Sequence, residues 1–153
     1  MRIYIDSPQN YSKFLNTPLF DQYGEPTERV FSGLENLLDG YVYASKIHAR
    51  SSDNNPNNYE IEKVYIVGSG ADRNEPYSDI DFLFIAPKLD LASSNAIKVA
   101  LAMMFFCDRP KNEAIDVFIR KEDAYPNRAS INITNKVGVQ ILLNRYMNKL
   151  LKE

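Results

Sequence analysis

Two aspartates flank the first residue of an apolar run in the segment SDIDFLFIA (78–86). The run IDFLFIA (80–86) predicts a buried strand, and residues two apart in a strand share a face. Asp79 and Asp81 are therefore expected to project together, with their Cβ atoms ~6.6 Å apart. Carboxylates at the start of a buried strand cost free energy unless something binds them. The start of this strand is thus the first candidate site.

A third aspartate, Asp116, interrupts another apolar run, EAIDVFI (113–119). If this predicted strand lies beside the strand at 80–86, Asp116 joins Asp79 and Asp81. Three carboxylates on one face repel each other, and two divalent ions ~3.5–4 Å apart would satisfy them. Ligands that are all oxygen favour Mg²⁺ or Mn²⁺ over zinc or copper. The sequence therefore predicts a two-metal site.

Gly68 and Ser69 follow the apolar run KVYIV (63–67), which also predicts a buried strand. A glycine directly after a strand permits a sharp turn and leaves backbone amides open to an anion, and the Ser69 hydroxyl adds a donor. We expect the rest of this stretch, up to residue 78, to be a loop. A nucleoside triphosphate would place its β- and γ-phosphates on the turn and its α-phosphate near the metals.

The remaining pattern alternates helices with these strands and predicts a mixed α/β (α+β) fold, in which helices pack on a small mixed sheet. One domain is expected over residues 1–153, with a core at about 28–120, an N-terminal extension at 1–26 and a C-terminal helix at about 134–152. The other expected elements are helices at 27–48 and 91–107, caps at Thr27 and Thr134, an Asn-rich loop at 51–59, an edge strand RIYID (2–6) and a short helix SPQNYSKFL (7–15) capped by Ser7.

Composition excludes several classes of protein. The formal net charge of −2 gives no global basic field for nucleic acid, although a local patch stays open. A single cysteine, Cys107, rules out an internal disulfide, and the single histidine, His48, rules out a His-rich zinc site. No run reaches the ~18 apolar residues of a membrane span, and the first residues lack the apolar core of a signal sequence. A cytoplasmic location without a membrane partner is expected.

The arrangement of Gly68–Ser69, Asp79, Asp81 and Asp116 resembles the polymerase-beta-type nucleotidyltransferase superfamily, and within it most closely the minimal nucleotidyltransferase group. The resemblance covers about residues 28–120. It implies a nucleotidyltransferase palm in which the first two acids hold the metals, while the third helps to bind one metal and activates the attacking hydroxyl.

The same resemblance implies a reaction and its cofactors. A nucleoside monophosphate, AMP in the first instance, moves from ATP to an acceptor hydroxyl with two Mg²⁺ (or Mn²⁺) ions. Gly70 and Asp72 stand where family members carry phosphate-binding arginines, and Arg73 either compensates for them or is a solvated loop residue. The residues expected to bind the nucleotide are Gly68, Ser69, Arg73 and Ser78.

The acceptor and the partner stay open at this point. A palm alone makes an open site, so a homo-oligomer or a partner chain is expected to close it. In the minimal group that partner is often a small helical protein of the HEPN type, in a toxin–antitoxin pair. A second hypothesis is an inactive palm that binds a nucleotide or a partner without reacting. A third is transfer to a small molecule, as in aminoglycoside nucleotidyltransferases.

Overall fold

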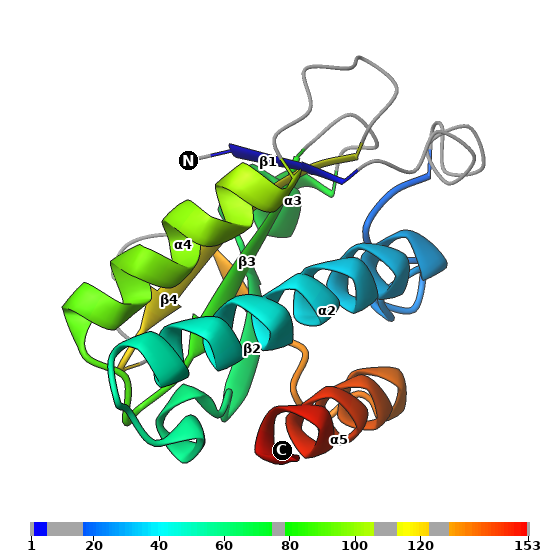
Figure 1. Ribbon diagram of the computed structural model, residues 1–153. Coiled ribbons are helices and arrows are strands. Elements are labelled where there is room, and N and C mark those ends of the chain that lie inside the picture. Colours follow the sequence, from blue (N-terminus) through cyan, green and yellow to red (C-terminus); the bar gives the residue numbers. More distant parts are fainter. Residues whose placement is uncertain (1, 6–16, 75–78, 106–112, 123–128, 153) are drawn as a thin grey trace.

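The computed structural model describes residues 2–5, 17–74, 79–105, 113–122 and 129–152 (Figure 1). These residues form a mixed α/β fold, in which helices pack on a five-stranded sheet of order β1-β4-β3-β2-β5. The strands are β1 (Arg2–Ile5), β2 (Lys63–Val67), β3 (Ile80–Ile85), β4 (Glu113–Arg120) and β5 (Ser130–Asn132). The helices are α2 (Glu28–Ser51), α3 (Gly68–Arg73), α4 (Leu91–Phe105), α5 (Val137–Leu151) and the 3₁₀ turn η1 (Pro56–Tyr59).

The sheet is mixed because one of its strand pairs is parallel. β3 and β4 lie side by side in parallel, joined by a connection that contains α4, whereas β2 pairs antiparallel with β3. β1 and β5 pair antiparallel with β4 and β2 and form the two edges of the sheet. The condition stated for Asp116, that its strand lies beside the strand at 80–86, is met by this pairing. The expected edge strand near the N-terminus is present as β1.

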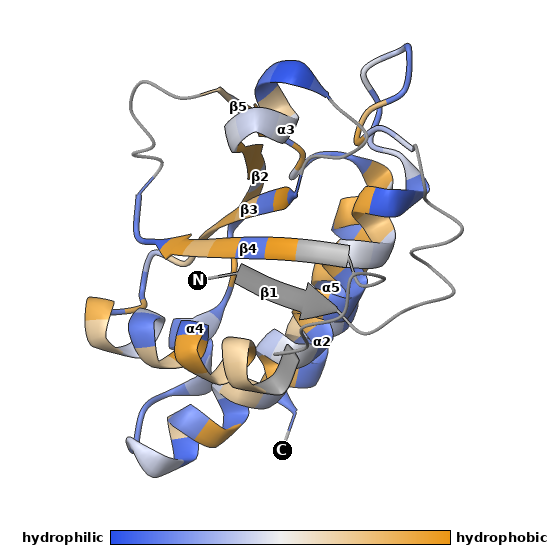
Figure 2. Ribbon diagram, turned by 90° about the horizontal axis from the view of Figure 1, so that it is seen from above, coloured by the Kyte–Doolittle hydropathy of each residue, from blue (hydrophilic) through white to orange (hydrophobic). Residues whose placement is uncertain are grey.

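One face of the sheet carries α2, α4 and α5, as the views from the front and from above agree (Figures 1 and 2). Ile80, Phe82 and Phe84 of β3 point into the core beneath these helices and are fully buried. Alternation then directs Asp81, Leu83 and Ile85 to the other face, where Leu83 and Ile85 join Val67 in a second, smaller apolar cluster. The acids therefore belong to the face opposite the helical layer.

A glycine lets α2 approach the sheet near the acids. A Cβ atom on Gly33 would lie 3.1 Å from Cδ1 of Ile115 and 3.3 Å from Cδ1 of Ile80. These two isoleucines are partners across β3 and β4 and directly precede Asp116 and Asp81. Gly33 lowers helix propensity, but its missing side chain is what permits this close packing. The helical layer thus supports the backbone of the strand ends that carry the acids.

Several local predictions are wrong. The segment that follows β2 was expected to be a loop, but residues Gly68–Arg73 form α3. Thr27 is the N-cap residue of α2, as predicted, but its side chain makes no capping hydrogen bond and its hydroxyl donates to the carbonyl of Pro18. Thr134 does not cap α5, which begins at Val137. The Thr134 hydroxyl accepts from the N–H of Val64 and donates to the carbonyl of Val64. This buried pair of bonds takes the place of a capping bond to α5. The short helix at 7–15 with Ser7, and Cys107, lie outside the described residues.

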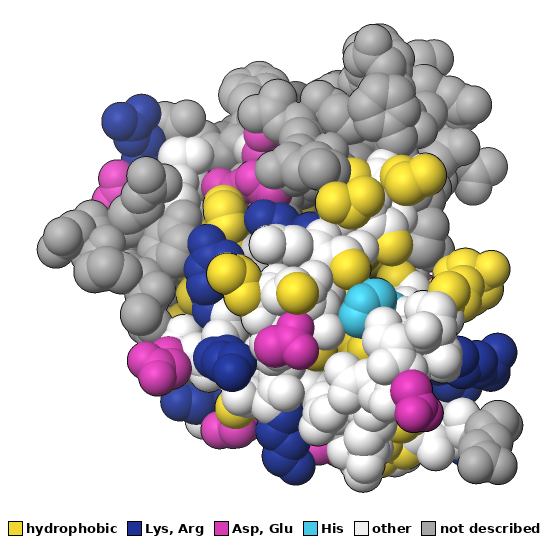
Figure 3. All heavy atoms as spheres, turned by 60° about the vertical axis from the view of Figure 1, so that its left-hand side comes forward, with side chains coloured by type: hydrophobic (Ala, Val, Ile, Leu, Met, Phe, Trp, Pro, Cys, Tyr) yellow, Lys and Arg dark blue, Asp and Glu magenta, His cyan; other side chains and the backbone are white. Residues whose placement is uncertain are grey.

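α4 is less buried than its apolar composition predicts. Ile97 and Leu101 are fully buried, whereas Leu91, Val99 and Met103 are exposed. Figure 3, in which the side of the molecule that carries α4 comes forward, shows hydrophobic side chains interspersed with polar ones. None of the helices in the described ranges is both long enough and apolar enough to cross a membrane.

Candidate metal and nucleotide site

Strand register brings two of the three predicted acids together. Asp81 of β3 and Asp116 of β4 are direct partners across the parallel pair, so their side chains leave neighbouring backbones on the same face. Both residues are half-buried. Neighbouring strands lie ~4.8 Å apart, which places two carboxylates within the reach of a shared cation. This pair is the centre of the candidate site.

Gly68 forms the wall of the site next to Asp81. It follows Val67, the partner of Asp81 across β2 and β3, and its φ of +75° lies in the left-handed region that favours glycine. A Cβ atom at Gly68 would lie 2.5 Å from Oδ2 of Asp81. The position therefore requires glycine twice, for its backbone angle and for the carboxylate that lies against its Cα. The predicted sharp turn at Gly68 is confirmed.

Asp79 differs from the prediction in one respect. The strand begins at Ile80, so Asp79 precedes β3 and strict strand alternation does not fix its orientation. It is half-buried, as Asp81 and Asp116 are. One carboxylate oxygen of Asp116, Oδ1, accepts a hydrogen bond from the backbone N–H of Val117 at 2.9 Å. Asp79 thus directly precedes the strand that carries Asp81, and strand alternation does not determine the direction of its side chain.

The donor chemistry fits a hard divalent ion, but the side chains are not gathered around one point. Within the described ranges, no group of three His, Cys, Asp or Glu residues is arranged so that it could hold a metal ion. Carboxylate oxygens are the ligands that Mg²⁺ and Mn²⁺ prefer. Shared coordination by Asp79, Asp81 and Asp116 therefore requires side-chain rotation from the described arrangement.

The residues predicted to bind the nucleotide differ in how far the structure places them. Gly68 and Ser69 open α3, and Ser69 is exposed on its first turn. Asp72 and Arg73 are both exposed on the same short helix, so neither side chain is fixed by burial. Ser78 lies outside the described residues. The structure thus describes the glycine turn in detail and leaves the other proposed phosphate contacts as predictions.

Sequence reasoning missed Asn74, which anchors this end of the sheet. Asn74 has a φ of +54° and ends α3 in the left-handed conformation that asparagine tolerates. Its side chain accepts from the N–H of Phe20 at 2.8 Å and donates to the carbonyl of the same residue at 2.9 Å. The segment around Phe20 is thereby tied to α3. Asparagine within a polar stretch is a turn signal, but its partner 54 residues away is invisible in the sequence.

Comparisons with protein families, with curated proteins and with solved structures found no match for this chain.

Proposed function

We propose that this protein is a metal-dependent nucleotidyltransferase that moves a nucleoside monophosphate, AMP, from ATP to an acceptor hydroxyl. The observation that carries the proposal is the pairing of Asp81 with Asp116 across parallel strands, with Gly68 packed against the Asp81 carboxylate. Paired carboxylates beside a glycine turn combine a cation site with an approach for phosphate.

Each residue has a role in this proposal. Asp79, Asp81 and Asp116 would hold the Mg²⁺ or Mn²⁺ ions, which when bound neutralise the negative charge of the triphosphate. The acceptor oxygen forms a bond to the α-phosphorus, the bond to the bridging oxygen of the β-phosphate breaks, and pyrophosphate leaves. Asp116 takes the hydroxyl proton or orients the group that takes it. The residues assigned to the phosphates are Gly68, Ser69, Arg73 and Ser78.

The acceptor belongs to a second molecule in this proposal. The last helix, α5, packs against α2 on the face away from Asp81 and Asp116, so α5 does not cover the acids. We propose that a second copy of the chain, or a small helical protein of the HEPN type in a toxin–antitoxin pair, completes the site and supplies the hydroxyl.

Substitution of one acid tests the activity. Asp79→Asn should abolish magnesium-dependent transfer of label from α-labelled ATP to the acceptor, and release of pyrophosphate with it, while the far-UV circular dichroism spectrum stays unchanged. Asp72→Asn is the matched control, since it makes the same chemical change at an exposed acid of α3 and should leave transfer at or above the original rate. Full activity of the Asp79→Asn variant would contradict the assignment.

An inactive palm that binds a nucleotide or a partner is the second candidate. The lack of a gathered three-acid group in the described residues favours it, as does the exposed Asp72 on the helix that follows the glycine turn. Titration calorimetry with ATP and Mg²⁺ separates the two functions. The binding module would be favoured if ATP binds but no pyrophosphate is released, whether the acceptor supplied is a second copy of the chain or a helical partner protein.

A further inference from the structure

A cavity of about 580 Å³ lies at the end of the sheet opposite the acids. Its walls come from the C-terminal turn of α2, the Asn-rich loop that follows it and the C-terminus of α5. This loop leads into Lys63, the first residue of β2, whereas Asp81 pairs with Val67, the last residue of the same strand. The cavity is therefore separate from the site proposed for catalysis. Its volume is within the range of small-ligand sites.

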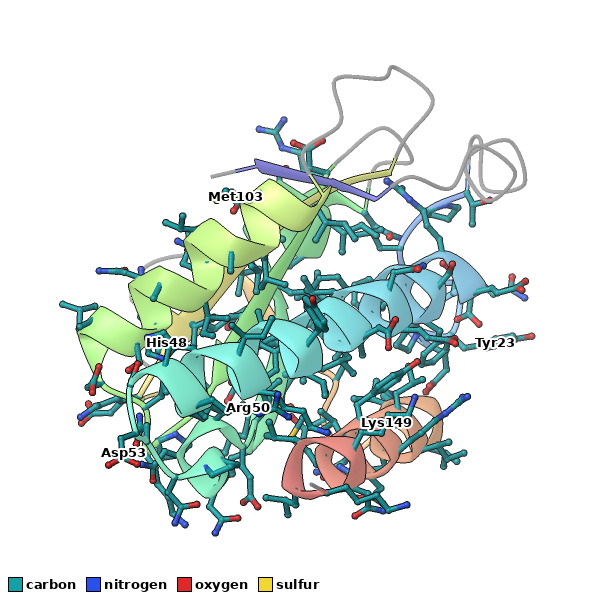
Figure 4. All side chains as sticks on the ribbon, viewed as in Figure 1. Tyr23, His48, Arg50, Asp53, Met103 and Lys149 are labelled. Atoms are coloured by element: carbon teal, nitrogen blue, oxygen red, sulfur yellow. The ribbon has the colours of Figure 1, made fainter. Side chains whose placement is uncertain are left out.

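Positive charge predominates in this cavity although the whole chain is acidic. Lys46 and Arg50 of α2 and Lys152 after α5 line it, against the single carboxylate of Asp53. Figure 4 shows Arg50 and Asp53 at the same end of the molecule. Among the described residues, no carboxylate forms an ion pair with any of the three cations. Three cations and one acid give the lining a net charge of +2, in a chain whose net charge is −2.

The Asn-rich wall of the cavity is held in place by its own hydrogen bonds. Asn54 Oδ1 accepts from the N–H of Asn55 at 2.9 Å, and Asn55 Oδ1 accepts from the N–H of Asn57 at 2.9 Å. The following turn is tied to α2, because Nδ1 of His48 and the hydroxyl oxygen of Tyr59 are 2.6 Å apart. The loop is thus preorganised, and less entropy is lost when a ligand binds to it.

Apolar side chains form another part of the lining. Leu150 is buried, Leu151 is exposed, and Pro56 and Ala49 complete the apolar surface. Arginine and lysine beside an apolar wall match a ligand that joins an anionic group to an apolar body. We propose that this cavity binds a small phosphomonoester whose phosphate contacts Lys46, Arg50 and Lys152 and whose apolar part lies on Leu151.

Basic residues are also common at helix C-termini, where they interact favourably with the helix dipole. Lys149 in the last turn of α5 is such a residue. Its Nζ lies 4.7 Å from the centre of the Tyr146 ring, and Lys149 does not line the cavity. It offers a matched control, because it is a lysine in the last turn of a helix that borders the same cavity.

The test uses inorganic phosphate and phenyl phosphate as probes, with the full chain in EDTA so that metal-dependent binding at the acids is silent. Backbone amide shifts of residues 46–55, 57 and 150–152 should saturate with both probes, and phenyl phosphate should bind more tightly. The double variant Lys46→Gln/Arg50→Gln should weaken binding about tenfold or more, the effect of losing hydrogen bonds to a charged group. Lys149→Gln should leave the affinity unchanged, and Asp53→Asn should increase it.

Two results would overturn the proposal. One is the absence of saturable shifts at these residues with either probe. The other is an equal loss of affinity in Lys46→Gln/Arg50→Gln and in Lys149→Gln, which would indicate general attraction of anions to helix ends. Circular dichroism and thermal unfolding of each variant show whether a loss of binding comes from a loss of fold.

Discussion

The two ends of the sheet hold charged groups in different ways. At the acid end, the strand pairing of Asp81 with Asp116 and the backbone angle of Gly68 fix the geometry. At the basic end, Lys46 and Arg50 reach a cavity from the surface of a helix on long side chains. Short side chains on a sheet are positioned by the backbone, whereas long ones keep rotamer freedom until a ligand orders them. The backbone therefore restricts the positions of the paired acids more narrowly than those of the cations that line the cavity.

The largest expected effect separates the roles proposed for these two ends. Asp116→Asn should lower transfer more than about 100-fold, the loss typical when the group that takes or orients the proton of the nucleophile is removed. Asparagine keeps an oxygen that can accept from the N–H of Val117, so the unfolding free energy should hardly change. Lys46→Gln/Arg50→Gln should leave transfer intact. Transfer activity and phosphate affinity are measured for both variants. The division of roles between the two ends would be wrong if either variant changes both quantities.

The next effect concerns how the backbone positions Asp81. Gly68→Ala places a side chain at a φ of +75° and against Oδ2 of Asp81. The left-handed angle costs about 1–2 kcal/mol and the overpacking about 1–3 kcal/mol more, and the displaced carboxylate should reduce transfer as well. Urea unfolding measures the loss of stability.

Gly24→Ala is the control for the backbone term. Gly24 has a φ of +78°, and among the described residues no heavy atom lies within 4 Å of a Cβ built there. The Gly24→Ala variant should lose stability only by the cost of the left-handed angle, and its transfer activity should be unchanged. Equal losses of stability and activity in the two variants would mean that the contact between Gly68 and Asp81 does not matter.

The strands of the acid end could be predicted from the sequence, because a buried strand has a recognisable local pattern of apolar residues. The runs at 63–67, 80–86 and 113–119 predicted β2, β3 and β4, and the helical periodicities predicted α2, α4 and α5. The sequence left the meeting of residues 81 and 116 conditional on their two strands being adjacent, and the parallel pairing of β3 with β4 meets that condition.

What the sequence did not reveal depends on contacts between distant segments. Thr134 bonds to Val64, 70 residues away, instead of capping α5. Asn74 holds Phe20 through a pair of bonds that no local pattern signals. The basic cavity needs the ends of α2 and α5 to meet, and each end alone reads as an ordinary solvated terminus. Local propensity therefore predicted the elements, and tertiary contacts decided their ends and the second site.

The smallest expected effect is a pH dependence at the end of the sheet that carries the cavity. Asp90 follows β3, and its Oδ1 accepts from the N–H of Ser93 at 2.7 Å at the start of α4. This backbone bond, and then a bond from the Ser93 side chain, holds the pKa of Asp90 below its ordinary value of 3.8, with smaller contributions from Lys121 and His48. The charged form is thus favoured in the folded state.

A lowered folded-state pKa contributes stability that is present above the unfolded-state pKa and is lost as the pH falls through the folded-state pKa. Asp90→Asn keeps a capping oxygen but has no charge to titrate. The excess stability of the original chain over this variant should therefore be constant near neutral pH and should shrink below about pH 4. Urea unfolding at several pH values measures it. A difference that grows toward acid pH would mean that the protonated form of Asp90 is the favoured one, and that the helix cap at this end of the sheet does not act through charge.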